Sequence, residues 1–126
     1  MSFGGAVLIE RRQYVRLKVD TTMEYYIDYV EKKKTVPVRD VSGGGLRFLT
    51  KEELAPGRTL SVIFALPETS DTIQAVAEIV WARPAKGMTG IYEAGVNFVE
   101  IDPFDREKIG DYVHNQAKSL RELAVQ

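Results

Sequence analysis

The sequence predicts a mainly β fold: a six- to seven-stranded antiparallel β-barrel followed by one C-terminal α-helix. Two patterns lead to this prediction. Short runs of β-branched and aromatic residues, separated by glycines, prolines and charged residues, follow one another from residue 14 to residue 99. The rest of the chain carries apolar residues at helical spacing instead. Because an open sheet of many short strands would expose its edges, we expect the sheet to close into a barrel.

Seven segments have the composition of strands. In the third segment, Pro37 indicates a sheet edge or a bulge. In the sixth, alternate apolar residues that include Ile79 and Trp81 fall on one face, so we expect Trp81 to pack in the core. The segments are 14–19, 23–30, 35–41, 46–50, 59–66, 72–82 and 92–99.

Two other segments have helical character. Residues 51–57 end in a proline and a glycine, and we expect a short helical turn there. Asp102 suits a helix N-cap and Pro103 the first helical position. We expect this C-terminal helix to cap the mouth of the barrel, while pairing with a second copy into a homodimer is the alternative. Its apolar stripe is Ile109, Tyr112, Val113, Gln116, Leu120 and Leu123.

The chain therefore divides into a flexible N-terminal arm (1–10), a barrel domain (11–101) and the C-terminal helix (102–126). Its 126 residues are enough for one hydrophobic core. The net charge of −1 argues against general nucleic-acid binding, and the absence of cysteine excludes disulfides and zinc–thiolate sites. A single histidine argues against a metal centre or an acid–base enzyme, and no apolar run could span a bilayer. We expect a cytoplasmic protein.

Two short stretches carry the chemistry of a ligand site. Arg11, Arg12 and Arg16 lie within six residues, and a guanidinium can grip a phosphate or the O6/N7 edge of guanine. Asp40 and Ser42 are two residues apart, so in a strand both side chains project to one face. The glycines that follow, Gly43, Gly44 and Gly45, permit positive φ and a close approach of ligand to backbone.

Together the two stretches resemble the signature of the PilZ domain, R-x-x-x-R followed by [D/N]-x-S-x-x-G. The resemblance implies a receptor for the bacterial second messenger cyclic di-GMP (c-di-GMP), without catalysis and with no other cofactor or metal. It implies that Arg12 and Arg16 bind phosphate and guanine, and that Asp40 and Ser42 read a guanine edge across the turn 43–45. In this family, arginine at the position of Arg11 accompanies an intercalated pair of ligand molecules.

The same resemblance leads to expectations about signalling. The C-terminal tail is similar to that of flagellar-brake proteins of the YcgR type. We expect the arm and the arginine loop to order over the ligand and so change the surface offered to an unidentified effector protein. Control of motility, biofilm formation or exopolysaccharide synthesis would be the output.

Three other interpretations are open on the sequence. The chain could be a PilZ-like protein-interaction module that binds no nucleotide. It could be a barrel that binds single-stranded nucleic acid on an aromatic face. It could be a hydrolase that uses Ser42, for which the sequence shows no partner histidine at a suitable spacing. The aromatic face of the second interpretation would consist of Tyr14, Tyr25, Tyr26 and Tyr29.

Overall fold

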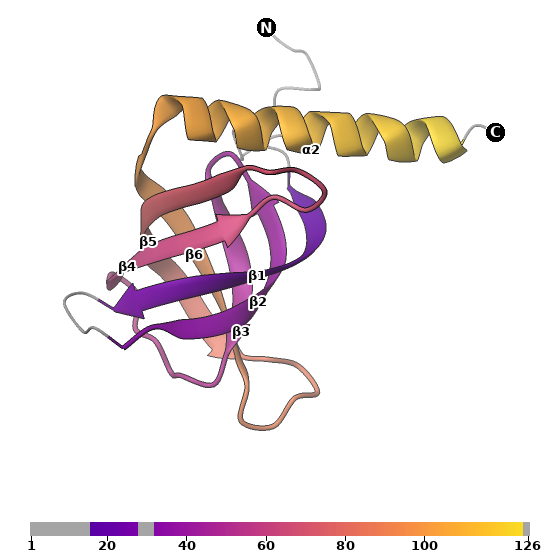
Figure 1. The fold of residues 1–126 in the computed structure, drawn as a ribbon. Helices are drawn as coiled ribbons and strands as arrows, with labels where there is room; N and C mark the ends of the chain where they lie inside the picture. Colours follow the sequence, from indigo (N-terminus) through magenta and orange to yellow (C-terminus); the bar gives the residue numbers. More distant parts are fainter. Residues whose placement is uncertain (1–15, 28–31, 125–126) are drawn as a thin grey trace, which may run out of the picture.

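The computed structural model describes residues 16–27 and 32–124, which form one closed antiparallel β-barrel with a helix across one end (Figure 1). Neighbouring strands follow the order β1-β2-β3-β6-β5-β4, and β4 pairs with β1 to complete the barrel. The predicted fold class is therefore confirmed. The elements are β1 (Leu17–Ile27), β2 (Lys34–Ser42), β3 (Gly45–Thr50), β4 (Thr59–Ala65), β5 (Thr72–Pro84), β6 (Tyr92–Ile101) and α2 (Pro103–Ala124).

Two local predictions are wrong. The first two expected strands are one continuous strand, β1, whose pairing with β2 is irregular between Lys18 and Thr21. The polar residues there look like a break, but a strand that is half-exposed on its outer face accommodates them. Residues 51–57 form bends and a turn instead of a helical turn, which buries Leu54 and lets Gly57 donate a backbone hydrogen bond to Ile79.

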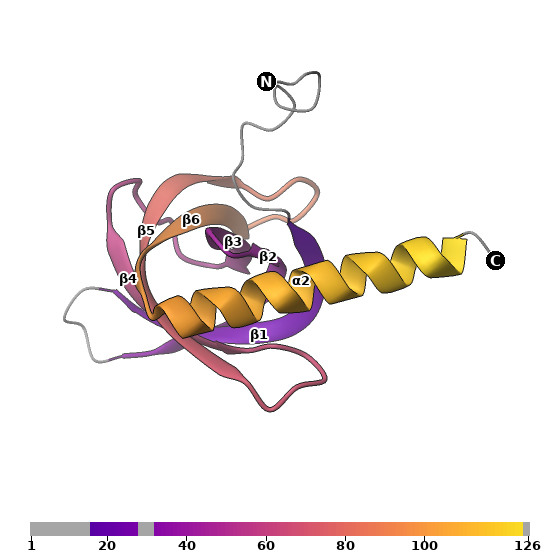
Figure 2. The same cartoon turned by 90° about the horizontal axis from the view of Figure 1, so that it is seen from above.

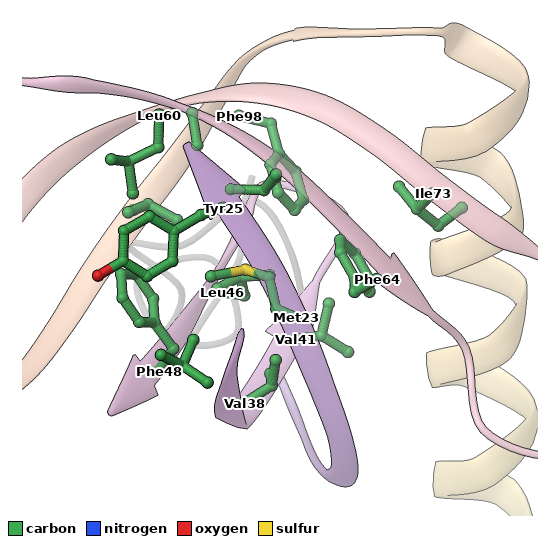
Figure 3. Packing of buried hydrophobic residues seen from close by; sticks show 14 of the residues in the cluster. Met23, Tyr25, Val38, Val41, Leu46, Phe48, Leu60, Phe64, Ile73 and Phe98 are labelled. Carbon is green, nitrogen blue, oxygen red and sulfur yellow. The ribbon is translucent and has the colours of Figure 1, made fainter. Parts of the chain in front are cut away.

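The core fills the barrel interior with alternate residues from all six strands (Figure 3). This alternation follows from the strand period of two, which sends successive side chains to opposite faces. Tyr25 is the largest fully buried side chain, and its ring lies 5.5 Å from that of Phe48. Its hydroxyl contacts Thr50 Oγ1 at 2.8 Å and donates to Glu52 Oε1 at 2.5 Å, so the phenol is satisfied inside the core.

Helix α2 closes one end of the barrel, as predicted. The N-cap is confirmed, because Asp102 Oδ1 accepts a hydrogen bond from the backbone N–H of Phe104 at 2.8 Å. Ile109 and Val113 are buried and join the core. The second half of the helix runs past the barrel (Figure 2), where Leu120 and Leu123 are 59% and 67% exposed.

The outer wall formed by β2, β3, β6 and β5 is the part of the fold that positions the candidate site. No helix among the described residues is long and apolar enough to cross a membrane.

Candidate functional site

The pairing of β1 with β2 brings the two predicted motifs to the same place. Leu17 pairs with Val41 and Lys18 with Asp40. Arg16 immediately precedes Leu17 and is exposed. It therefore lies at the start of β1, beside the end of β2 that carries Asp40 and Ser42. Arg11 and Arg12 lie outside the described residues. The last arginine of the first motif and the acidic start of the second are therefore neighbours in space.

The turn between β2 and β3 is held by Ser42. The Ser42 hydroxyl donates to Gly45 O at 3.3 Å and accepts from the Gly44 N–H at 3.2 Å. Ser42 and Gly45 are paired across the hairpin, which leaves Gly43 and Gly44 as a two-residue turn. In this structure the hydroxyl fixes the shape of the turn, and a ligand would have to share it.

The three glycines do not adopt the backbone conformation that we expected of them. None of them adopts positive φ, which among the described glycines is confined to Gly57, Gly87 and Gly90. Gly45 is required by packing, because a Cβ there would lie 1.9 Å from the carbonyl oxygen of Val96 on β6. The last glycine of the motif thus allows β3 and β6 to pair closely.

Asp40 is almost fully buried and bound to Arg47. Its side chain is 4% exposed, and its Oδ2 accepts from Arg47 Nε at 2.7 Å and also from Arg47 Nη2. The hydrogen bond to Asp40 raises the pKa of the Arg47 guanidinium and outweighs the opposite effect of burial. Asp40 Oδ1 is buried without a hydrogen-bond partner among the described residues. A buried acceptor of this kind is costly, so this oxygen is the natural place for a donor from a ligand or from the arginine motif.

A row of residues continues from Asp40 across the outer wall. Asp40 pairs with Arg47, Arg47 with Gly95, and Gly95 with Trp81, so all four positions share one face. The Trp81 ring packs against Gly95, where a Cβ would meet the ring at 2.5 Å. The guanidinium carbon of Arg83 lies 4.6 Å from the centroid of this ring, within the range of a cation–π contact.

The prediction that Trp81 packs in the core is therefore wrong. The pairing of β5 with β6 shifts register between Ile79 and Trp81, which leaves Val80 as an extra, half-exposed residue. A bulge reverses the alternation of the residues beyond it, and Trp81 consequently points out of the barrel.

A second carboxylate lies on the same wall, beneath three arginines. Glu93 Oε1 accepts from Arg83 Nη2 at 3.0 Å and from Arg83 Nε at 3.3 Å. Glu93 Oε2 lies 3.6 Å from Arg47 Nη1 and 3.7 Å from Arg39 Nε. The guanidiniums are more exposed than the carboxylates, so the wall presents positive charge outward over a buried negative layer.

Sequence reasoning missed Arg47, Glu93, Arg83 and the outward position of Trp81. Arg47 could have been found, because a two-residue turn at Gly43 and Gly44 pairs residue 47 with residue 40 by counting. The other three come from strands distant in sequence, and a bulge intervenes, so no local signal indicates them.

A hollow in the described part of the molecule lies away from this wall. Its volume is about 680 Å³, and it is lined by residues of β1, β4, β5, β6 and the start of α2, among them Tyr26 and Val99. None of the predicted site residues lines it. Among the described residues there is no cluster of three or more side chains that could hold a metal ion.

Fold and wall together define a small β-barrel with an arginine-rich outer face suited to planar, anionic ligands. The sequence model of the PilZ domain matches residues 10–115, so the chain belongs to the PilZ family. No curated protein matches the sequence at a significant level.

Solved structures of PilZ proteins have the same fold. The Bacillus subtilis inhibitor of motility MotI/DgrA superposes with a TM-score of 0.78 at 19% identity, over 87% of this chain and 53% of its own. The PilZ domain of Escherichia coli YcgR with c-di-GMP gives 0.71 at 15% identity, over 93% and 99%. The K. pneumonia MrkH–c-di-GMP complex gives 0.71 at 15% identity, over 89% and 54%. The chain thus spans about half the length of MotI/DgrA and of MrkH.

Proposed function

We propose that this protein is a cytoplasmic receptor for c-di-GMP in bacterial second-messenger signalling, and not an enzyme. The observation that carries the proposal is the β1–β2 register, which sets Arg16 beside Asp40 and Ser42. Membership of the PilZ family supports it, as do the c-di-GMP complexes of YcgR and MrkH among the structures with the same fold.

In the proposed site, Arg12 and Arg16 bind the phosphates and the O6/N7 edge of guanine, and Asp40 accepts from the Watson–Crick edge. The hydrogen bonds of Asp40 support this proposal, because Oδ2 already accepts twice from Arg47 and Oδ1 is the acceptor left over. Guanine carries an N1–H donor on that edge, whereas adenine has an acceptor at N1, which would face the carboxylate oxygen unfavourably. Ser42 and the turn 43–45 would shape the floor of the site.

Trp81 extends the proposed site along the wall. Its ring packs on Gly95 in the same row as Asp40 and Arg47, and a base that stacks on it would take the place of the Arg83 guanidinium over the ring. Trp81 is the only tryptophan of the sequence, so intrinsic fluorescence reports on this position alone. Titration with c-di-GMP should change the emission intensity, and adenosine monophosphate serves as the control ligand.

Calorimetry and thermal unfolding with c-di-GMP test the proposal. At a ligand concentration about 100 times Kd, binding to the native state adds about 2.7 kcal/mol, which raises the Tm of a domain of this size by about 10 °C. Arg16→Ala and Asp40→Ala should each weaken binding by about a hundredfold, because each removes a charged hydrogen-bond partner. Lys86→Ala, in the exposed β5–β6 turn, is the matched control. No heat and no shift in Tm for the unmodified protein would refute the receptor function and favour an interaction module.

We further propose a stoichiometry of two ligands per chain, motivated by Arg11. Calorimetry should give two c-di-GMP molecules for the unmodified protein and one for Arg11→Ala. A single ligand bound to the unmodified protein would contradict the intercalated pair while leaving the receptor function intact.

The signalling step proposed here is the seating of the arginine motif against the wall. If this is correct, c-di-GMP should slow amide hydrogen exchange across residues 1–16 relative to residues 103–124. Capture experiments with and without c-di-GMP would then identify the effector whose binding depends on the ligand. Exchange rates that do not change in residues 1–16 would rule out this coupling.

Self-association through α2 is proposed as a separate property. The apolar stripe that the barrel covers at Ile109 and Val113 continues to Leu120 and Leu123, which are exposed. We expect a dimer in sedimentation equilibrium that Leu120→Lys dissociates. Val99→Lys, which changes a similarly exposed apolar residue on the barrel, should leave the dimer intact. A monomer at all concentrations would exclude the homodimer.

The structure does not favour the single-stranded nucleic-acid interpretation. Tyr25 is fully buried and Tyr26 is half-buried beside the hollow on the far strands, while Tyr14 and Tyr29 lie outside the described residues. Of the four tyrosines of the expected aromatic face, the two that the structure describes therefore do not form it. Binding of an oligonucleotide with a steep salt dependence would reverse this conclusion.

A further inference from the structure

Glu93 is the meeting point of three arginines from three strands. Arg39 comes from β2, Arg47 from β3 and Arg83 from β5. Glu93 comes from β6, which lies between β3 and β5 in the barrel. Both oxygens of the Glu93 carboxylate are engaged, Oε1 by two nitrogens of Arg83 and Oε2 by Arg47 and Arg39 at 3.6 and 3.7 Å. Glu93 lies outside both signature motifs, so its role does not follow from them.

The burial of these side chains is graded. The Glu93 side chain is 11% exposed, whereas those of Arg47, Arg39 and Arg83 are 26%, 44% and 62% exposed. The carboxylate therefore lies beneath the guanidiniums and holds them from below, and the two more exposed arginines, Arg39 and Arg83, are the ones that an anion can reach. Three like charges this close would otherwise separate, since each sits on a long side chain with many rotamers.

We propose that Glu93 is a positioning residue for the nucleotide site. It orders Arg39, Arg47 and Arg83 before the ligand arrives. Binding then does not have to supply the conformational entropy of fixing these side chains, because folding has already fixed them. This inference rests on the proposed c-di-GMP function. The contact of Glu93 with Arg47 also links this wall directly to Asp40, because the same guanidinium bonds both carboxylates.

Glu93→Gln separates positioning from simple electrostatics by the sign of its effect. Removing a negative charge near an anionic ligand should tighten binding if only the net field matters. If Glu93 positions the arginines, the substitution should weaken c-di-GMP binding by about tenfold, because neutral hydrogen bonds hold guanidiniums less firmly. Glu100→Gln is the matched control, since it removes the same charge from an exposed position at the far end of β6. It should leave Kd unchanged or slightly lower it.

A second measurement needs no ligand. In the NMR spectrum of the free protein, the Nε–H of Arg83 should exchange slowly in the unmodified protein and in Glu100→Gln, and rapidly in Glu93→Gln. Glu93→Asp keeps the charge but withdraws the carboxylate by one methylene, and it should resemble Glu93→Gln in both measurements. It also serves if the glutamine variant does not fold.

The outcomes separate the two proposals. Slow Arg83 exchange that Glu93→Gln abolishes supports the ordering of the arginines by Glu93. If the unmodified protein nevertheless binds no c-di-GMP, the proposed function fails, and with it the nucleotide as the ligand of this ordered wall. If the unmodified protein binds c-di-GMP and Glu93→Gln and Glu93→Asp bind it equally well or more tightly, the positioning role is overturned while the receptor function stands. Unchanged Arg83 exchange in both variants would overturn it as well.

Discussion

Replacing Gly45 with alanine should destabilise the barrel strongly. Built on the existing backbone, the new Cβ lies 1.9 Å from Val96 O, 3.0 Å from Val96 C and 3.1 Å from Asn97 Cα. All three atoms belong to the backbone of β6, so no side-chain rotation can relieve the clash. β3 and β6 must therefore move apart where Gly45 pairs with Asn97.

The size of the effect follows from what that separation breaks. The backbone N–H of Phe98 donates to Gly44 O at 2.8 Å, next to the clash, and this bond would be strained or lost. Overpacking costs about 1–3 kcal/mol and a lost hydrogen bond about 1 kcal/mol, so we expect a loss of about 3 kcal/mol. With an unfolding entropy of about 2.1 cal/mol/K per residue, this lowers Tm by about 11 °C for a chain of this length.

Differential scanning calorimetry of the ligand-free protein measures this change. Gly110→Ala is the control, because Gly110 lies in α2 with open space around its Cβ position. That substitution should raise Tm by about 3 °C, since alanine is about 0.8–1.0 kcal/mol better than glycine inside a helix. If Gly45→Ala melts within 2 °C of the unmodified protein, on the order of the effect of a neutral surface change, the packing argument is wrong.

Three further predictions concern the core and the wall. Tyr25→Phe leaves Glu52 and Thr50 without the phenol and should cost about 1–3 kcal/mol in urea unfolding at neutral pH. Burial first, and then the bond to Glu52, raise the pKa of Tyr25 above its usual value near 10, so the folded state holds this proton more tightly than the unfolded chain. The stability that this proton contributes is fully present below about pH 10 and is lost as the pH rises further. Tyr25→Phe should therefore reduce the loss of unfolding free energy at alkaline pH, as measured by urea titrations. An equal loss in both proteins would contradict the raised pKa of Tyr25. Gly95→Ala should lift the Trp81 ring off the sheet, red-shift its emission and weaken c-di-GMP binding, whereas an unchanged spectrum would mean that the ring is not seated there.

The strands and the helix could be predicted because their signals are local. The strand-like composition of 59–66 and 92–99 and the Asp102–Pro103 start of α2 each depend on residues adjacent in sequence, and the structure has β4, β6 and α2 there. The expected break between the first two strands was wrong because it does not depend on local sequence alone. Whether polar residues interrupt a strand depends on which face meets solvent, and only the assembled barrel decides that.

The candidate site likewise has a part that local sequence predicts and a part that it does not. The part made by the β2–β3 hairpin could be predicted, since a two-residue turn fixes which residues share a face, and Asp40 and Ser42 do lie on one face. The wall that Trp81, Arg83 and Glu93 build could not. Glu93 is brought toward Asp40 by the pairing of β3 with β6, and Trp81 and Arg83 require the pairing of β6 with β5 as well. The bulge at Val80 then decides that Trp81 points outward.

The signature residue Asp40 depends on side chains that lie outside both motifs. Asp40 is oriented by Arg47, Arg47 is shared with Glu93, and Glu93 also binds Arg83, which lies on Trp81. The conformation of the motif carboxylate therefore depends on a chain of contacts that ends on β5, three strands away. A substitution at Glu93 or Gly95 alters the surroundings of Asp40 without touching either motif. The two motifs alone consequently do not specify the site, because the same residues on a wall without this network would leave the Asp40 carboxylate differently held.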